Sequence, residues 1–225
     1  MIAIISGTAF VSLKNKCEKI TVETPYGQVE LLRTKLSGKD VYFLQRHGNG
    51  MKVPPHLVNY CANIWALKAA KVDKIISVFA VGSLKQKIEP GDYAVVDDFV
   101  DLTKSRAPTF FEKEKVHIDV SEPYDPKIRM ALLSACKNAG AKAHDGGVYV
   151  CTEGPRFETK VEIRMMAQFG DVVGMTGVPE VVLANELKIP YGALAFSTNY
   201  ACGIKGALDG DEIDRICAGK AKEIQ

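Results

Sequence analysis

Residues 74–79, Lys-Ile-Ile-Ser-Val-Phe, are the stretch of sequence on which the fold assignment rests. Short apolar runs rich in Ile and Val, of which this is the most apolar, are typical of strands in a buried sheet. Working outward from it, similar runs predict further strands at residues 2–5, 29–32, 41–44, 93–96, 148–151, 172–174 and 192–196. Pro25-Tyr26-Gly27 predicts a hairpin turn.

Segments of helical period alternate with these runs. In residues 56–70, Leu57, Tyr60, Ile64 and Leu67 recur at three- and four-residue spacing, which indicates a helix. Further helices are predicted at residues 126–139, 160–169, 179–187 and 212–224. This alternation indicates the α/β class, with a mixed or parallel sheet covered by helices. We interpret residues 1–225 as a single domain, because no linker, repeat or low-complexity tract divides them.

Composition and charge exclude several classes of protein. The 225 residues are 47% hydrophobic and 25% charged, which excludes disorder and collagen-like order. The formal net charge is only +2, too balanced for a protein that neutralises many phosphates of a polymer. No run approaches the roughly 18 to 20 apolar residues that span a bilayer, and the opening apolar run is too short for a signal peptide. We therefore expect a cytoplasmic protein that binds neither nucleic acid nor membrane.

Four long irregular segments, at residues 6–12, 45–55, 99–123 and 152–159, carry most of the informative motifs. A compact domain seldom contains such loops without a functional reason. Three of the four leave a predicted strand at its carboxyl end, where open α/β sheets form their ligand crevices. The six cysteines form no CxxC pair and have no histidine at metal-ligand spacing, so no metal site is expected.

Two of these segments suit an oxyanion. Ser6-Gly7-Thr8 places a glycine and two hydroxyls directly after the first strand, where backbone N–H groups and a hydroxyl can cradle an anion. Arg46 and His47 follow the 41–44 strand and offer a charged fork and a switchable donor, both suited to a phosphate-sized anion. Taken singly, each has a plainer interpretation: a strand-ending turn for the first segment and a structural histidine for the second.

A third segment suits a flat heterocycle. Phe157 and Glu158 stand beside a Gly-Pro bend, where an aromatic face can stack on a ring while a carboxylate accepts from its N–H. The competing interpretation is a solvated loop anchored by a buried Phe. Small residues at 79–83 would let a ligand approach the main chain closely, and hydroxyl and amide groups at 175–180 and 197–201 follow two more predicted strands.

Together these motifs resemble those of a known family. They include Arg46-His47-Gly48, Pro54-Pro55-His56, Gly82-Ser83, Pro90-Gly91-Asp92, Thr109-Phe110-Phe111, Glu153-Gly154-Pro155-Arg156-Phe157 and Val178-Pro179-Glu180. In this order they resemble the 5′-methylthioadenosine phosphorylase branch of the trimeric purine nucleoside phosphorylase family, over about residues 1–205. The resemblance implies a twisted mixed sheet, partly closed into a barrel and flanked by helices, in a chain that assembles as a homotrimer or a dimer of trimers.

The resemblance also implies which residues form the site. It assigns phosphate binding to Thr8, Arg46, His47, Phe79, Ala80 and Thr176, and substrate binding to Phe157, Glu158, Met175, Asn199, Tyr200 and Ala201. His117 would reach a neighbouring subunit's site near the sugar 5′ substituent, which the helix beginning around Asp211 would cover with Leu208 and Ile213. Inorganic phosphate would be a co-substrate, and no organic cofactor or metal is implied. The sequence offers no physical reason for Gly177 beside the ribose.

The base end of this implied site departs from the 5′-methylthioadenosine phosphorylases, which typically carry two aspartates where this chain has Asn199 and Ala201. The phosphorylases for inosine and guanosine instead carry Phe-Glu-Thr and Thr-Asn, as this chain does at residues 157–159 and 198–199. A 6-oxopurine presents an N1–H donor and an O6 acceptor, which complement the Glu158 carboxylate and the Asn199 amide. We therefore expect Asn199, Glu158 and His47 to be catalytic in the phosphorolysis of a 6-oxopurine nucleoside.

The sugar and two alternative functions stay open at this point. Leu208 and Ile213 suit a 5′-methylthio group, so S-methyl-5′-thioinosine is the expected substrate, with inosine or guanosine as the other possibilities. One alternative is a 5′-methylthioadenosine phosphorylase that tolerates Asn199. The other is a non-catalytic purine- or phosphate-binding protein, which we would expect to have lost the Arg46–His47 pair or a hydroxyl-bearing turn.

The choice of base gives a testable prediction. Replacing Asn199 with Asp points a carboxylate at the O6 carbonyl and restores an acceptor for a 6-amino group. The ratio of kcat/KM for inosine to that for adenosine should fall by about 10- to 1,000-fold, measured by phosphate-dependent release of the free base. Adding Glu158→Ser should enlarge the change. An unchanged preference in the Asn199→Asp variant would contradict the 6-oxopurine assignment.

Overall fold

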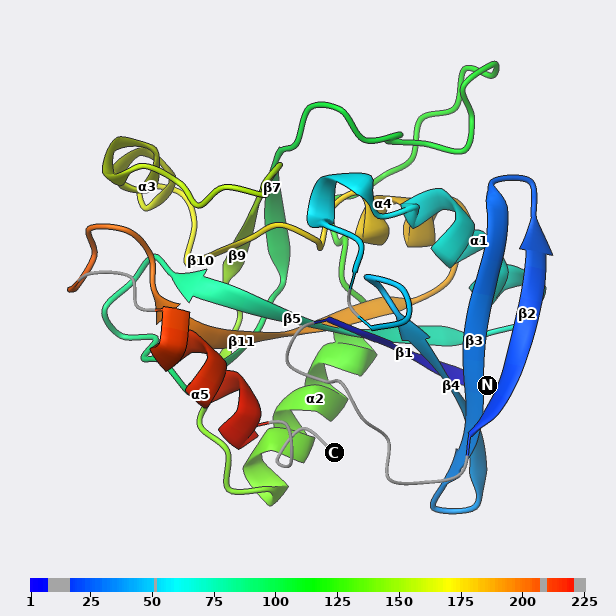
Figure 1. Cartoon of the computed structure of the whole chain (residues 1–225), viewed down its shortest axis with the longest axis horizontal. Helices are drawn as coiled ribbons and strands as arrows, with labels where there is room; N and C mark the ends of the chain where they lie inside the picture. Colours follow the sequence, from blue (N-terminus) through cyan, green and yellow to red (C-terminus); the bar gives the residue numbers. More distant parts are fainter. Residues whose placement is uncertain (8–16, 51, 207–209, 221–225) are drawn as a thin grey trace.

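The computed structural model describes residues 1–7, 17–50, 52–206 and 210–220, and in this part of the chain an 11-stranded mixed sheet carries helices on both of its faces. In Figure 1, α1 (Tyr60–Ala69), α3 (Lys160–Met166) and α4 (Glu180–Glu186) lie above the long central strands. On the opposite side lie α2 (Pro126–Asn138) and α5 (Gly210–Lys220). The predicted α/β class is thus confirmed.

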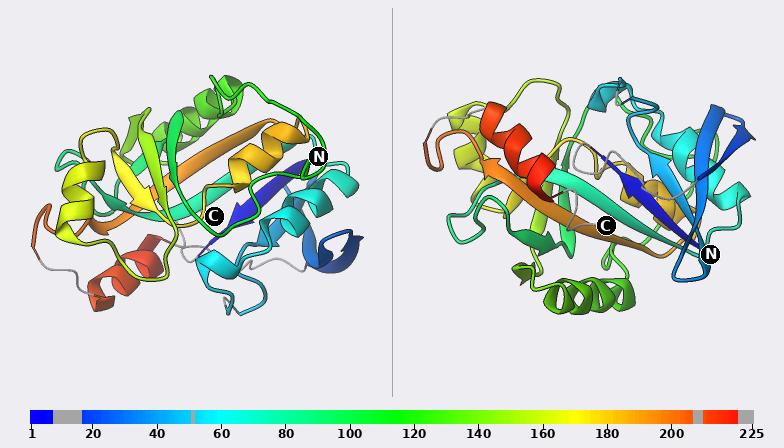
Figure 2. Two further views of the ribbon diagram at one scale, coloured as in Figure 1. Left: turned by 90° about the horizontal axis from the view of Figure 1, so that it is seen from above. Right: turned by 60° about the horizontal axis from the view of Figure 1, so that its bottom comes forward.

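Four parallel strands form the centre of the sheet in the order β4 (Lys39–Gln45), β1 (Ile2–Ser6), β5 (Lys74–Ser83) and β11 (Tyr191–Tyr200). They are built from the predicted apolar runs, and most of their side chains are buried. In the right-hand view of Figure 2, β5 and β11 run side by side across the molecule. Because the four strands are parallel, their carboxyl ends meet at one edge of the sheet.

The sheet branches at β5. Along one edge this strand pairs with β11, while its other edge pairs first with β1 and then, at Gly82 and Ser83, with β10. The remaining strands are β2 (Glu18–Thr24), β3 (Gly27–Leu36), β6 (Tyr93–Val95), β7 (Asp98–Leu102), β8 (Ala143–Asp145), β9 (Val148–Thr152) and β10 (Val172–Gly174). One branch continues through β10, β9 and β7, and the other through β11, β6 and β8. Among the described strands, hydrogen bonds do not close the sheet into a barrel.

Side-chain caps set several helix starts. Asn59, Asp125 and Thr159 accept hydrogen bonds from backbone N–H groups in the first turns of α1, α2 and α3. The cap at Asn59 explains why the single helix predicted over residues 56–70 is wrong at its start. Residues Pro55–Leu57 form a short 3-10 helix, and α1 begins only after Asn59.

The structure corrects three further expectations about the sheet. Three strands were missed, β2, β7 and β8, and β7 occupies the start of the segment 99–123 that was predicted to be an irregular loop. None of their residues is fully buried, and β7 and β8 are only five and three residues long, so they lack the continuous apolar run of a buried strand. Both β5 and β11 run four residues further than predicted, because Gly82 and Ser83 pair with β10 and β11.

Among the described residues, no helix is both long and apolar enough to cross a bilayer.

Candidate active site

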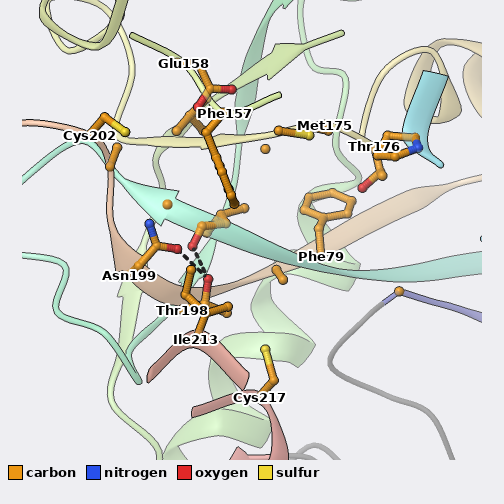
Figure 3. Close-up of a pocket in the computed structure, with 18 of the residues that line it drawn as sticks. Phe79, Phe157, Glu158, Met175, Thr176, Thr198, Asn199, Cys202, Ile213 and Cys217 are labelled. Carbon is orange, nitrogen blue, oxygen red and sulfur yellow. Dashed lines mark hydrogen bonds between the residues drawn. The ribbon is translucent and has the colours of Figure 1, made fainter. Parts of the chain in front are cut away.

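A pocket of about 250 Å³ opens where the carboxyl ends of the central strands meet. It is lined by residues of β5, β10, β11 and α5 and by the loops that follow β1, β4, β9, β10 and β11. Figure 3 shows Phe157, Glu158 and Asn199 toward one end, Phe79 and Thr176 toward the other, and Ile213 with Cys217 on the helix beneath. The structure brings these predicted residues together around it: Arg46, His47, Phe79, Ala80, Phe157, Glu158, Met175, Thr176, Asn199, Ala201 and Ile213.

Arg46 is anchored inside the protein by a charge of opposite sign. Its Nε lies 2.7 Å from Glu180 Oε2 and its Nη2 lies 3.0 Å from Glu180 Oε1, in a two-point contact. Nη2 also donates to Ser77 Oγ at 2.6 Å, and Nη1 donates to the carbonyl of Val78 at 3.2 Å. Burial alone would lower the pKa of Arg46, but the ion pair with Glu180 outweighs it and raises that pKa.

This geometry adds a buried partner to the Arg46 fork that the sequence analysis did not expect. Nε and Nη2 face Glu180, which leaves Nη1 nearest the pocket, and the charge of the guanidinium is largely neutralised before any ligand arrives. Glu180 Oε1 also accepts from the hydroxyls of Ser77 and Tyr191, at 2.6 and 2.7 Å, so its buried carboxylate is well supplied with donors. The sequence analysis did not expect Glu180 to pair with Arg46. The one feature of the sequence that pointed to Glu180 was its place in the Val178-Pro179-Glu180 motif.

Beside Arg46, His47 and Gly7 converge on the same corner of the pocket. A Cβ built on Gly7 would lie 2.8 Å from Arg46 Nη1 and 4.0 Å from His47 Nε2, so the absence of a side chain at Gly7 keeps this corner open. His47 Nδ1 lies 2.8 Å from the carbonyl oxygen of Val53. A carbonyl only accepts, so Nδ1 carries a proton and donates it there, which leaves Nε2 as the other ring nitrogen available to a ligand.

The charge state of His47 follows from its surroundings. Burial lowers the pKa of His47, and the nearby positive charge of Arg46 lowers it further. The imidazole is therefore neutral at neutral pH, with a lone pair on Nε2. Such a nitrogen accepts a proton from a hydroxyl, which suits an oxyanion that still carries one hydrogen, such as monohydrogen phosphate.

At the other end of the pocket, a β-bulge presents Asn199. The β11–β5 register shifts between Ser197 and Asn199, so Thr198 is an extra residue in the strand. Without the bulge, Thr198 and Asn199 would point to opposite faces of the sheet; both line the pocket here. Asn199 Oδ1 accepts from Thr198 Oγ1 at 2.8 Å, and Nδ2 donates to the Tyr200 carbonyl at 2.9 Å. One amide hydrogen and one oxygen lone pair of Asn199 are left for a ligand.

The turn that carries Met175 and Thr176 to the pocket explains Gly177. The hydroxyl of Tyr149 accepts from the backbone N–H groups of Thr176 and Gly177, at 3.0 and 3.1 Å. A Cβ on Gly177 would lie 2.7 Å from the ring of Tyr149 and 3.2 Å from that of Phe79. The missing side chain therefore makes room for Tyr149, which holds the Met175–Thr176 turn in place.

Some predicted residues are not brought to the pocket. Tyr200 stands outside the lining, with its hydroxyl 3.4 Å from the carbonyl of Gln86 and Lys205 over its ring. His117 is exposed to solvent and does not line the pocket within this chain. Thr8 and Leu208 lie outside the described residues. Conversely, Cys202 and Cys217 line the pocket without having been predicted, since a single cysteine carries no positional signal.

Comparison with known proteins gives a consistent result. A family model described as "Phosphorylase superfamily" matches residues 1–224. A "Probable 6-oxopurine nucleoside phosphorylase" of Dictyoglomus turgidum is 52% identical over 208 residues, covering 90% of this chain and 79% of that protein. A "Probable S-methyl-5′-thioinosine phosphorylase" of Methanosarcina acetivorans is 47% identical, covering 98% and 84%. The solved methylthioadenosine phosphorylase of Schistosoma mansoni in complex with adenine superimposes with a TM-score of 0.94 at 30% identity, covering 99% of this chain and 87% of that one.

The buried ion pair gives a prediction about stability. Arg46→Met leaves the Glu180 carboxylate buried without its counter-charge, and Glu180→Leu leaves the Arg46 guanidinium buried in the same way. Each single change should therefore lower the free energy of unfolding by about 3 to 5 kcal/mol. The double variant buries no uncompensated charge and should recover part of that loss, as measured by chemical denaturation. A double variant as unstable as the sum of the two singles would show that the two charges do not depend on each other.

Proposed function

The chain belongs to the phosphorylase superfamily, and we propose that it uses inorganic phosphate to cleave the N-glycosidic bond of a 6-oxopurine nucleoside. The predicted enzyme class, purine nucleoside phosphorylase, is confirmed by the family and by relatives of 44–52% identity that bear this name. The alternative of a non-catalytic binding protein is thereby set aside. The single observation that carries the choice of base is that Glu158 and Asn199 face the same pocket as Arg46 and His47, with no aspartate among its described lining residues.

The phosphate lies, in this proposal, at the corner formed by Gly7, Arg46 and His47. Nη1 of Arg46 donates to a phosphate oxygen, the lone pair on His47 Nε2 accepts the phosphate hydrogen, and the hydroxyl of Thr176 completes the contacts. Phe79 and Ala80 contribute main chain from β5, and Thr8 follows Gly7 in the chain. Because Glu180 already balances Arg46, binding here depends on placed hydrogen bonds more than on net charge.

The reaction follows from the order of groups along the pocket. The bond between C1′ and N9 breaks, its electron pair moves onto the purine, and the ribosyl group gains oxocarbenium character. A phosphate oxygen then bonds to C1′ from the opposite face, which yields the α-sugar 1-phosphate, and the purine anion takes up a proton from solvent to become the free base. The phosphate anion stabilises the ribosyl cation, with Met175 against the sugar, and the amide of Asn199 stabilises the charge on the departing purine. No metal or organic cofactor takes part in this scheme.

The base-reading groups favour a 6-oxopurine. A carboxylate oxygen of Glu158 accepts the N1–H of hypoxanthine or guanine, and the free amide hydrogen of Asn199 donates to O6. Phe157 stacks on the ring, and Ala201 lines the site where a methylthioadenosine phosphorylase has an acid. Against adenine, Glu158 would face a bare ring nitrogen, and two acceptors would then meet without a hydrogen between them, at a cost of about 1 to 3 kcal/mol.

The sugar end favours a 5′-methylthio group. Helix α5 presents Ile213 and Cys217 to the pocket, and these side chains suit a thioether better than a hydroxyl. We therefore propose S-methyl-5′-thioinosine as the preferred substrate, with inosine or guanosine as weaker ones. The likeness to solved methylthioadenosine phosphorylases supports the alternative, 5′-methylthioadenosine as substrate, and the Glu158 carboxylate argues against it.

The proposed reaction is tested by its products. Hypoxanthine release should require phosphate, and kcat/KM should be higher for 5′-methylthioinosine than for inosine. The release of adenine from 5′-methylthioadenosine should have a far lower kcat/KM than either. Chromatography of the base separates the three reactions in one experiment. Preference for methylthioadenosine would overturn the base assignment and leave the phosphorylase class in place, while release without phosphate would overturn the phosphate site.

We also propose that the chain assembles as a homotrimer or a dimer of trimers. Support comes from apolar side chains on the surface near the pocket: Phe157 is 55% exposed, and Val161 and Met165, one turn apart on α3, are 64% and 50% exposed. His117 lies exposed on a long segment and is free to reach a neighbour's pocket.

The assembly prediction is checked by mass in solution. Light scattering at assay concentration should give three or six times the mass of the 24.5 kDa chain. His117→Ala should preserve that mass and lower kcat/KM, because its effect would be exerted in a neighbour's site. A fully active monomer would contradict both the assembly and the role of His117.

A further inference from the structure

The carboxylate of Glu158 is held by a hydroxyl group that no step above has used. Thr152 Oγ1, at the end of β9, lies 2.6 Å from Glu158 Oε1. The same hydroxyl is 3.4 Å from the carbonyl of Gly174, but it has a single proton to donate. The shorter contact is to the charged acceptor, and an O–H···O⁻ hydrogen bond of this length is of the strong, charge-assisted kind. The proton of Thr152 is therefore given to Glu158.

We infer that Thr152 is a positioning residue that sets the base specificity of the pocket by orienting Glu158. The inference rests on the proposed function, in which Glu158 reads the purine N1–H. With Oε1 engaged by Thr152, the carboxylate cannot rotate freely, and Oε2 is the oxygen left to accept from the base.

The backbone around Thr152 is rigid enough to serve this purpose. Thr152 pairs with Leu102 at the end of the β9–β7 ladder, and its carbonyl accepts from Arg106 Nη2 at 3.2 Å. The side chain of Arg106 is only 2% exposed, and Nη2 also donates to the carbonyls of Glu153 and Met175, at 2.9 and 2.7 Å. One buried guanidinium thus ties the strand that carries Thr152 to the turn that carries Met175.

The other base-reading group has a matching arrangement. Asn199 Oδ1 accepts from the hydroxyl of Thr198, just as Glu158 Oε1 accepts from that of Thr152. Each threonine occupies one lone-pair site of its partner and leaves the remaining polar atoms for the base. Side chains that are already oriented lose less conformational entropy when a ligand binds, which increases discrimination between a matching base and a mismatched one.

The test compares four variants. Thr152→Val keeps the shape of the side chain and removes its hydroxyl, whereas Thr152→Ser keeps the hydroxyl. The other two are Glu158→Gln and the double variant Thr152→Val/Glu158→Gln. Each is assayed with phosphate and either inosine or adenosine. Thr152→Val should lower kcat/KM for inosine by about 10- to 100-fold while changing that for adenosine by about twofold or less. Thr152→Ser should restore most of the loss.

Two further readouts separate positioning from general damage. The KM for phosphate should be unchanged in Thr152→Val, since the phosphate corner is at the other end of the pocket. In the Glu158→Gln background, Thr152→Val should have little additional effect, because there is no carboxylate left to orient. The positioning role of Thr152 would be overturned if Thr152→Val left the ratio of kcat/KM for inosine to that for adenosine unchanged. It would also be overturned if Thr152→Val lowered kcat/KM for inosine equally with Glu158 and with Gln at that position. Neither result would affect the proposed function. A wild-type enzyme inactive on inosine and 5′-methylthioinosine would overturn the proposed function and this inference together.

Discussion

The buried ion pair between Arg46 and Glu180 is the interaction on which the rest of the site depends. It joins the end of β4 to the start of α4, and through the hydroxyls of Ser77 and Tyr191 it also joins β5 and β11. Two charges removed from water are tolerated only when their remaining hydrogen bonds are satisfied, and here Ser77, Val78 and Tyr191 satisfy them. The pair therefore connects four elements, β4, β5, β11 and α4, next to the pocket corner that Arg46 lines.

The same arrangement divides the chemistry of the pocket into two ends. At one end a neutral histidine and a charge-balanced arginine face a corner kept open by Gly7, a setting suited to a hydrogen-bearing oxyanion. At the other end the carboxylate and the amide that face the base are each held by a threonine hydroxyl. The ribose lies between the two in the proposed scheme, so the scissile bond spans a region where the protein supplies few charges of its own.

Much of this could be predicted from the sequence, and the rest could not, for physical reasons. Apolar runs identified the buried strands, and Arg46, His47 and Glu158 were recognisable because their chemistry suits a phosphate and a flat heterocycle. The role of Asn199 came only from the resemblance to a known family. The pairing of Arg46 with Glu180 spans 134 residues, and local patterns carry no information about contacts at that separation. The bulge at Thr198 and the extension of β5 through Gly82 and Ser83 depend on which strands pair. The edge strand β7 is five residues long with no buried side chain, too short to show a clear apolar pattern.

The most direct test of the account is a crystal structure of the protein soaked with hypoxanthine and phosphate, two ligands that do not react with each other. The account predicts hypoxanthine stacked on Phe157, with N1 within hydrogen-bond distance of Glu158 and O6 or N7 within that distance of the Asn199 amide. Phosphate should contact His47 Nε2 and Arg46 Nη1. Hypoxanthine bound with its N1 turned away from Glu158, or phosphate bound at another place in the pocket, would contradict it.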